Sequence, residues 1–266
     1  MIDRFGRTID YLRVSVTDRC NLRCSYCMPP GGVPLVAHSD ILSFEEIVEV
    51  VRTGVWMGIR KVRITGGEPL VRRGIQTLVA MISRIDGVAD LAMTTNGTLL
   101  APKAAALKEA GLRRVNISLD SMDPARYAAI TAGGDLRDAL AGIDAAGRVG
   151  LTPVKLNCVI EGSADEPDAR GVAEFAAQRG LEVRFIPRMD LATGRFGQVI
   201  GGNGGDCGRC SRLRLTSDGF IRPCLMSDLG FSVRQLGPAE AIRRAVEDKP
   251  QSGSSCENHW IRRIGG

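Results

Sequence analysis

Short runs of apolar and β-branched residues recur through the first 190 residues, and each run ends in polar residues or glycine. Runs of this length and composition are typical of β-strands. We therefore predict six strands, which cover residues 11–16, 62–65, 91–95, 115–119, 154–160 and 183–186.

The segments between these runs carry helical patterns. Ser43 stands three residues before Glu46 at the start of a periodic apolar stretch, which is the pattern of a helix capping box. Ala-rich stretches at 102–110 and 136–146 also predict helices. Alternation of strand and helix predicts an α/β fold with parallel strands joined by right-handed crossovers.

Two α/β architectures fit this alternation, an open doubly wound sheet and a whole or partial barrel. Six repeats favour a partial (β/α)6 barrel of the TIM type. In either architecture the reactive residues should lie at the carboxyl ends of the strands.

The pattern changes after residue 190. Residues 194–205 are rich in glycine, and the runs 212–215 and 220–222 flank Ser217-Asp218-Gly219 as a predicted β-hairpin. We therefore expect a partial barrel at residues 1–190 and a C-terminal extension at residues 191–266.

A cysteine triplet with the spacing C-x3-C-x2-C follows the first predicted strand, at Cys20, Cys24 and Cys27. Three thiolates on a four-iron cluster leave one iron open, and S-adenosylmethionine can chelate that iron through its amino and carboxylate groups. A structural zinc site is the weaker interpretation, because such a site needs four protein ligands and leaves no coordination position open. The spacing, with an aromatic residue before the last cysteine, resembles the radical S-adenosylmethionine (SAM) enzymes.

Polar and glycine residues end the next predicted strands. Gly66-Gly67-Glu68-Pro69 follows the second strand, where the glycines allow close approach of a ligand and Glu68 can accept from an ammonium group. Residues 94–97 and 116–120 end the third and fourth strands with hydroxyl and amide groups that suit ribose or carboxylate contacts. Each of these two segments is, on its own, more typical of strand-end turns than of a ligand site.

A second cysteine set, Cys207, Cys210 and Cys224, again offers three thiolates. Its alternative interpretation is a zinc ribbon completed by Cys256 or His259. Arg212 and Arg214 stand at alternate positions of a predicted strand beside this set, and therefore on one face. Paired guanidinium groups beside an open iron indicate an anionic ligand.

The composition indicates the role of the cysteines, the kind of partner and the cellular compartment. Six of the eight cysteines fall in the two sets, which favours metal ligands over disulfides in a reducing compartment. The net charge of +5 suits an anionic partner, but the dispersed basic residues and 5% aromatic content do not predict nucleic-acid binding. No stretch is long and apolar enough to span a membrane, and the first residues lack the apolar core of a secretion signal, so we expect a cytoplasmic protein.

Four groups of residues together resemble the GTP 3′,8-cyclase family of radical SAM enzymes, which opens molybdenum cofactor biosynthesis. They are residues 11–20, residues 63–70, the second cysteine set with its two arginines, and the terminal Ile264-Gly265-Gly266. The resemblance implies a lyase in which the 5′-deoxyadenosyl radical takes hydrogen from C3′ of GTP, and the ribose radical then attacks C8. The product is (8S)-3′,8-cyclo-7,8-dihydroguanosine 5′-triphosphate.

The same resemblance implies two [4Fe-4S] clusters and SAM as cofactors, with the second cluster holding guanine through its free iron. It implies that Cys20, Cys24 and Cys27 ligate the first cluster and that Cys207, Cys210 and Cys224 ligate the second. The implied contacts to SAM are Tyr26, Gly67, Glu68, Ser118 and Met189. The implied contacts to GTP are Arg13, Lys61, Arg63, Thr94, Lys155, Arg184, Arg212 and Arg214.

Simple electrostatics agrees with this substrate site, because cations that converge from separate strands repel one another unless an anion lies among them. The alternative for each cation is a solvent-facing side chain or an ion pair, for example with Glu182. No side chain stands out as a catalytic acid or base. We interpret Cys158 as a small core residue and leave Cys256 open between a free thiol and a metal neighbour.

The expected partners are GTP, an electron donor such as flavodoxin or ferredoxin, the next enzyme of the molybdopterin pathway, and a second copy of the chain in a homodimer; no membrane or nucleic acid is expected.

The chain departs from the family pattern in one segment. Family members carry several tens of residues between the equivalents of Met189 and Cys207, where this chain has only residues 190–206. We therefore expect a more open cleft, or a lid formed by the glycine-rich residues 194–205.

Three alternatives stay open for the function. The chain could be a paralogue that acts on another nucleotide, a peptide-modifying radical enzyme, or a regulator that binds iron–sulfur or zinc without catalysis. A peptide-modifying enzyme usually has more cysteines in its extension and a further domain before the first strand.

Overall fold

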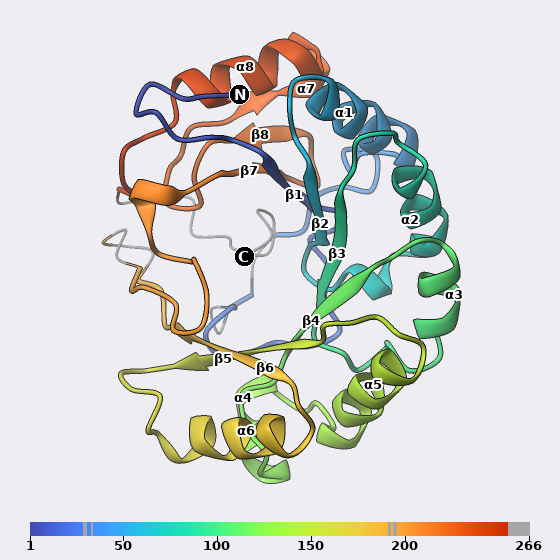
Figure 1. Ribbon diagram of the computed structural model, residues 1–266, viewed down its shortest axis with the longest axis vertical. Helices are drawn as coiled ribbons and strands as arrows, with labels where there is room; N and C mark the ends of the chain where they lie inside the picture. Colours follow the sequence, from blue (N-terminus) through green and yellow to red (C-terminus); the bar gives the residue numbers. More distant parts are fainter. Residues whose placement is uncertain (29–30, 33, 191–192, 194–195, 255–266) are drawn as a thin grey trace.

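The computed structural model describes residues 1–28, 31–32, 34–190, 193 and 196–254. Six parallel strands curl into an open arc (Figure 1). Each of them agrees within one residue at either end with its predicted range, which confirms the α/β assignment. They are β1 (Tyr11–Ser15), β2 (Lys61–Thr65), β3 (Asp90–Thr95), β4 (Arg114–Ser118), β5 (Lys155–Ile160) and β6 (Glu182–Pro187).

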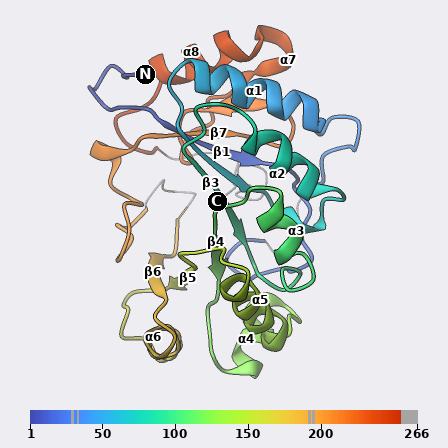
Figure 2. The same cartoon turned by 45° about the vertical axis from the view of Figure 1, so that its right-hand side comes forward.

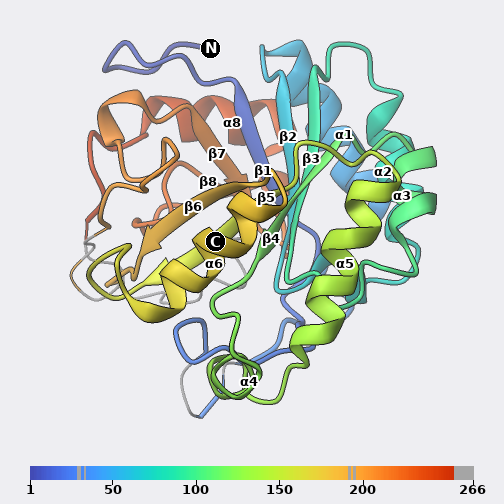
Figure 3. The same cartoon turned by 60° about the horizontal axis from the view of Figure 1, so that its bottom comes forward.

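Helices cover the outer, convex face of this arc, as Figure 1 shows from the end and Figure 3 from the side of α5 and α6. Their bounds are α1 (Phe44–Trp56), α2 (Ile75–Ser83), α3 (Ala104–Glu109), α4 (Pro124–Thr131), α5 (Leu136–Arg148) and α6 (Pro167–Gln178), with a 3-10 turn at Pro69–Val71. The predicted capping box is confirmed: Ser43 Oγ accepts from Glu46 N (3.1 Å) and Glu46 Oε2 accepts from Ser43 N (2.7 Å).

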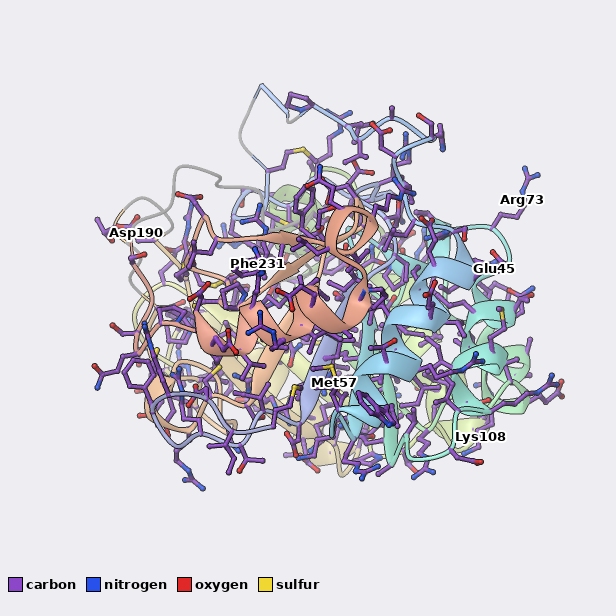
Figure 4. The ribbon with its side chains drawn as sticks, turned by 90° about the horizontal axis from the view of Figure 1, so that it is seen from above. Glu45, Met57, Arg73, Lys108, Asp190 and Phe231 are labelled. Carbon is purple, nitrogen blue, oxygen red and sulfur yellow. The ribbon has the colours of Figure 1, made fainter. Side chains whose placement is uncertain are left out.

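The C-terminal region continues the same sheet. β7 (Arg212–Leu215) pairs in parallel with β1, and β8 (Phe220–Arg222) and β9 (Phe231–Ser232) follow in antiparallel pairing, which confirms the predicted hairpin. A 3-10 turn (Cys207–Arg209) precedes β7, and α7 (Val233–Leu236) and α8 (Pro238–Glu247) follow β9. α8 packs beside α1 (Figures 2 and 4), close to Met57 at the end of α1. The division of the chain after residue 190 stays a prediction.

The arc is open between β6 and β9, which form the two edges of the sheet. The glycine-rich segment runs along this open side (Figure 1) and forms a bridge with β6. Phe185 N donates to Ile200 O (3.1 Å), and Ile200 N donates to Phe185 O (3.0 Å). The described part of this segment therefore covers the backbone of the β6 edge.

The two faces of the sheet differ in chemistry because side chains alternate along each strand. Residues such as Leu12, Ile64 and Val115 point to the helices and are buried in the main core. The alternate residues, such as Arg13, Arg63 and Asn116, occupy the concave face. Among the described residues, no helix is long and apolar enough to cross a membrane.

Candidate functional site

A cavity of about 180 Å³ lies at the carboxyl ends of the parallel strands. It is lined by the first cysteine triplet and by the ends of β2 to β6. The structure therefore brings together eight of the predicted site residues, which are Cys20, Cys24, Cys27, Tyr26, Gly67, Thr94, Ser118 and Met189.

The cysteine loop of this cavity is held by local and long-range hydrogen bonds. Cys24 O accepts from Cys27 N (2.9 Å) and Met28 N (3.0 Å), which turns the chain tightly between the thiols. Tyr26 Oη donates to Asp120 Oδ2 (2.7 Å), and Asp120 Oδ1 accepts from Val159 N (2.9 Å). The hydroxyl of Tyr26 thus fastens the loop to the ends of β4 and β5.

Burial, and after it the charge of Asp120, raises the pKa of the Cys24 thiol to about 12. A thiolate at this position is therefore favourable only with a cation bound to its sulfur. Three half-buried cysteines on one short loop supply the donor chemistry that an iron–sulfur cluster requires.

The glycine turn after β2 pairs with the start of the cysteine loop. Gly67 N donates to Thr17 O (2.7 Å), and Glu68 N donates to Arg19 O (2.8 Å). A Cβ atom on Gly67 would lie 2.3 Å from Arg19 O, closer than any side chain can approach. Glycine is therefore required for the two loops to meet at the cavity wall.

Glu68 is not among the residues that line the cavity, and its contact with a cofactor ammonium group stays a prediction. Its side chain is fully buried and accepts from Leu70 N (3.0 Å), Thr95 Oγ1 (2.7 Å) and Asn96 N (2.7 Å). Burial raises the pKa of Glu68 to about 7, although these three donors oppose the rise. In this structure Glu68 joins the β2 turn to the β3 turn.

The concave face of the sheet carries a layer of arginines. Register places Arg13 beside both Arg63 and Arg214, and Arg184 lies two strands from Asn116. The Asn116 amide, with its oxygen turned to the guanidinium groups, accepts from Arg63 Nη1 (2.9 Å) and Arg184 Nη1 (3.0 Å). Burial lowers the pKa of Arg13 well below its usual value, and Arg214 lowers it further.

Several buried polar atoms on this face have no hydrogen-bond partner among the described residues. Such atoms carry an energetic cost unless a ligand or water satisfies them. They come from five strands that surround one space. They are Tyr11 Oη, Arg63 Nε, Thr94 Oγ1, Asn157 Oδ1 and Arg184 Nε.

Two residues predicted to contact the substrate form ion pairs in this structure, and their contact with the substrate stays a prediction. Lys61 Nζ lies 2.9 Å from Asp10 Oδ2 at the beginning of β2. Lys155 pairs with Glu182, its register neighbour at the beginning of β6. Neither lysine lines either of the two described cavities, and each has a carboxylate as its charge partner in this structure.

A second cavity, of about 240 Å³, is lined by the second cysteine set and by Arg212 and Arg214. The Arg212 guanidinium lies 5.9 Å from the centre of the Tyr11 ring, and the Arg63 guanidinium lies 5.5 Å from the same ring. Burial, followed by the charge of Arg212, lowers the pKa of Arg214 to about 10. The second cavity is thus lined by two arginines and one aspartate, Asp206, in addition to its three cysteines.

A small apolar cluster joins the two cavities. Met189 lines the first cavity and Phe196 lines the second, and both pack against Leu225 and Met226. Phe196 belongs to the shortened segment between the barrel and the second cysteine set. Its role was missed in the sequence because the segment has no periodic pattern.

The sequence also missed Asn157 and Tyr11 on the concave face. Both stand two residues from a predicted contact in the same strand, and that spacing is the one signal that could have indicated them. Cys158, which follows Asn157 in β5, is fully buried in the main core, as predicted.

The described residues contain no group of three His, Cys, Asp or Glu side chains close enough to hold a single metal ion. Cys256, His259 and the terminal Ile264-Gly265-Gly266 lie outside the described residues.

Comparison with known proteins identifies the same family that the sequence motifs resemble. The family model of the Radical SAM superfamily matches residues 14–175. A GTP 3′,8-cyclase from Petrotoga mobilis is 40% identical, over 98% of this chain and 97% of that protein. Enzymes of the same name from Alkaliphilus oremlandii and Pelotomaculum thermopropionicum are 43% and 44% identical, each over the full length of both chains.

The alignment with the Petrotoga mobilis protein runs over 313 positions, more than the 266 residues of this chain. That relative therefore carries residues that this chain lacks.

Solved structures with low identity share the fold. Native anSMEcpe with bound AdoMet has a TM-score of 0.64 at 14% identity, and the match covers 96% of this chain and 83% of that chain. Streptococcus suis SuiB bound to S-adenosylmethionine also has a TM-score of 0.64 at 14% identity, with 91% and 64% of the two chains covered. These likenesses support the partial barrel and nothing finer.

Proposed function

This chain belongs to the GTP 3′,8-cyclase family of the radical SAM superfamily, and from that premise we propose how its own residues carry the reaction. The enzyme is a lyase that converts GTP to (8S)-3′,8-cyclo-7,8-dihydroguanosine 5′-triphosphate in molybdenum cofactor biosynthesis. One observation supports the proposal most strongly. Two cavities lined by cysteine triplets flank a buried arginine layer, in which Arg63 Nε and Arg184 Nε have no hydrogen-bond partner among the described residues.

The first cavity is the place for the [4Fe-4S] cluster and SAM, which the family implies. When bound, these groups supply the adenosyl radical that begins the reaction. Cys20, Cys24 and Cys27 hold the cluster, and Tyr26 keeps their loop in place through Asp120. Gly67, Ser118 and Met189 form the wall against which SAM is oriented. Glu68 stabilises that wall from behind, through its bonds to the β2 and β3 turns.

The space between the cavities is the place for the nucleotide. Thr94 Oγ1 and Asn157 Oδ1 face this space and suit the ribose hydroxyls, so that C3′ is presented to the first cavity. Arg63 and Arg184 keep free donors toward it, and they suit the triphosphate because guanidinium groups bind phosphate oxygens in pairs. An anion there also offsets the repulsion among buried arginines.

The second cavity is the place for a second [4Fe-4S] cluster and the guanine ring. Cys207, Cys210 and Cys224 would hold the cluster, and because they supply three thiolates, the cluster would keep one position for a ligand such as the base. Burial raises the pKa of the Cys210 thiol, but nearby Lys249, the Arg212 amide and the two arginines outweigh burial and lower it overall. The surroundings of Cys210 therefore favour its thiolate form.

The remaining features of the proposal concern partners. Reductive cleavage of SAM requires one electron from a donor such as flavodoxin or ferredoxin, and the next enzyme of the molybdopterin pathway takes the product. An oxygen-sensitive open iron suits the cytoplasm. A homodimer stays a prediction.

The direct test is anaerobic reconstitution of the full chain with iron and sulfide, followed by incubation with SAM, a reductant and one nucleotide at a time. We expect 5′-deoxyadenosine and the cyclised nucleotide with GTP, and neither with ATP or CTP. Turnover with another nucleotide but not with GTP would favour a paralogue. Bound zinc without SAM cleavage would favour a non-catalytic regulator.

A second test separates nucleotide binding from cluster binding. Arg214→Leu should weaken GTP binding to the reconstituted protein by at least about tenfold, because a charged hydrogen bond contributes about 1.5–3 kcal/mol. Iron content should not change. Arg209→Leu is the matched control, because Arg209 is exposed beside the same cysteines. Loss of iron in Arg214→Leu alone would instead assign that arginine a structural role.

A further inference from the structure

Lys249 is a buried lysine directly behind the second cysteine set. It follows α8, and 1% of its surface is exposed. Its Nζ donates to Arg212 O (2.8 Å) and to Pro223 O (2.5 Å). Arg212 stands two residues after Cys210, and Pro223 directly precedes Cys224. One ammonium group therefore ties together the two backbone segments that carry these cysteines.

The charge of Lys249 is buried beside the second cysteine set. Among the described residues, no Asp or Glu forms an ion pair with Lys249, in contrast to the buried Arg7, which pairs with Asp3 at 2.6 Å. A buried, uncompensated ammonium group is costly. The groups of opposite charge that act on it are Cys210 and Cys224 in their thiolate forms, and Cys210 also hydrogen-bonds to it, whereas Arg7 acts on it with a like charge.

Lys249 does not line the second cavity, whereas Arg212 and Arg214 do. The two arginines can therefore meet a ligand inside the cavity, whereas the lysine can act on one only indirectly, through the cysteines and the backbone of Arg212. This placement separates its role from nucleotide binding.

We propose that Lys249 is a positioning residue for the second iron–sulfur cluster: it aligns the segments of Cys210 and Cys224 and places a buried positive charge beside their sulfurs. The inference rests on the second cluster of the proposed function. A cluster held by thiolates becomes more negative when it accepts an electron, and a fixed cation in a low-dielectric surrounding stabilises the reduced form. Lys249 thus raises the reduction potential of this cluster.

The test uses the anaerobically reconstituted full chain and two substitutions. Lys249→Met removes both the charge and the donors, and Lys249→Gln removes the charge but keeps an amide donor. Iron content and the reduction potential of each cluster are measured by redox titration followed by electron paramagnetic resonance. The signal of the first cluster is identified by its change with SAM, and that of the second by its change with GTP.

We expect both variants to shift the potential of the second cluster to more negative values, or to lose that cluster, while the first cluster keeps its potential and its iron. Arg209→Gln is the matched control. It removes an exposed cation that directly precedes Cys210 in the sequence, and water screens that charge, so the potential should stay at the wild-type value.

Wild-type potentials in both Lys249 variants would overturn the inference. A wild-type potential in Lys249→Gln with a changed one in Lys249→Met would also overturn it, because hydrogen bonds without charge would then suffice. Failure of the proposed second cluster gives a different result, in which the wild-type protein itself binds the iron of one cluster only.

Discussion

Glu68 is a carboxylic acid without solvent contact, and its three hydrogen bonds join turns that both border the first cavity. The motif that contains it predicted a direct contact with SAM. In the described residues its side chain accepts hydrogen bonds from the end of β3 and from the turns after β2 and β3, so it stabilises the wall of the first cavity, and the contact with SAM stays a prediction. Its ionisation is therefore coupled to folding.

Glu68→Gln should change the pH dependence of stability. In the folded protein the pKa of Glu68 is about 7, above the 4.5 of a free glutamate side chain, so between these values the folded protein holds a proton that the unfolded chain has lost. The contribution of Glu68 to the free energy of unfolding therefore falls as the pH rises between these two pKa values, by up to about 3 kcal/mol. The variant should lack this decline.

The measurement is the melting temperature of each reconstituted protein between about pH 5.5 and 7.5. This range covers the upper part of the interval between the unfolded and the folded pKa of Glu68 and extends just beyond it. The difference between the two curves cancels the contribution of the clusters. For the control Glu49→Gln, at an exposed position of α1, the curve of melting temperature against pH should run parallel to that of the wild type. Parallel curves for Glu68→Gln as well would contradict the assignment.

α5 lies against the strand-end turn after β3 at unusually close range. A Cβ atom on Gly142 would lie 2.2 Å from Gly97 O, whereas a Cβ atom on Gly147, in the same helix, would meet nothing within 4 Å. The small residue at 142 therefore sets the distance between this helix and the turn that leads from Thr95 to Gly97. That turn also holds Glu68 and borders the first cavity.

Two alanine substitutions in α5 should have opposite effects. Gly142→Ala should destabilise the protein by about 1–3 kcal/mol or more, because the helix must move away from the turn. Gly147→Ala should stabilise it by up to about 1 kcal/mol, because alanine is the better helix residue and the site is open. Chemical denaturation of both variants checks this, and equal effects of the two would contradict it.

The two ends of the described chain meet through Arg7. Its guanidinium group pairs with the buried Asp3 and donates to Cys207 O (2.8 Å), Pro250 O (2.7 Å) and Gln251 O (3.1 Å). One side chain of the N-terminal segment thus holds both the second cysteine set and the segment that follows Lys249.

Arg7→Met should destabilise the whole molecule by about 3–5 kcal/mol, because it leaves the carboxylate of Asp3 buried without a counter-charge. The double variant Asp3→Asn with Arg7→Met should recover part of this loss. Arg4→Met, at an exposed neighbour, should have little effect. Thermal unfolding followed by circular dichroism measures all three, and no recovery in the double variant would show that the carboxylate is not the cause.

The sequence alone predicted the elements of this protein and its kind of chemistry. The six strands agree with their apolar runs, the capping box of α1 is present, and the two cysteine triplets line the two cavities. These features are local: side-chain periodicity, a cap and ligand spacing each depend on residues close together in the chain. Local patterns can therefore be read without the fold.

Tertiary structure decided how the charged and polar residues are used. Arg63 and Arg184 lie far apart in the sequence, but strand register brings both to Asn116, whereas Lys61 and Lys155 meet carboxylates at the beginnings of their strands. The same holds for Glu68, for Lys249, and for the glycine-rich segment that lies along β6. The partner of a charge depends on register and packing between distant segments, and no local pattern encodes that information.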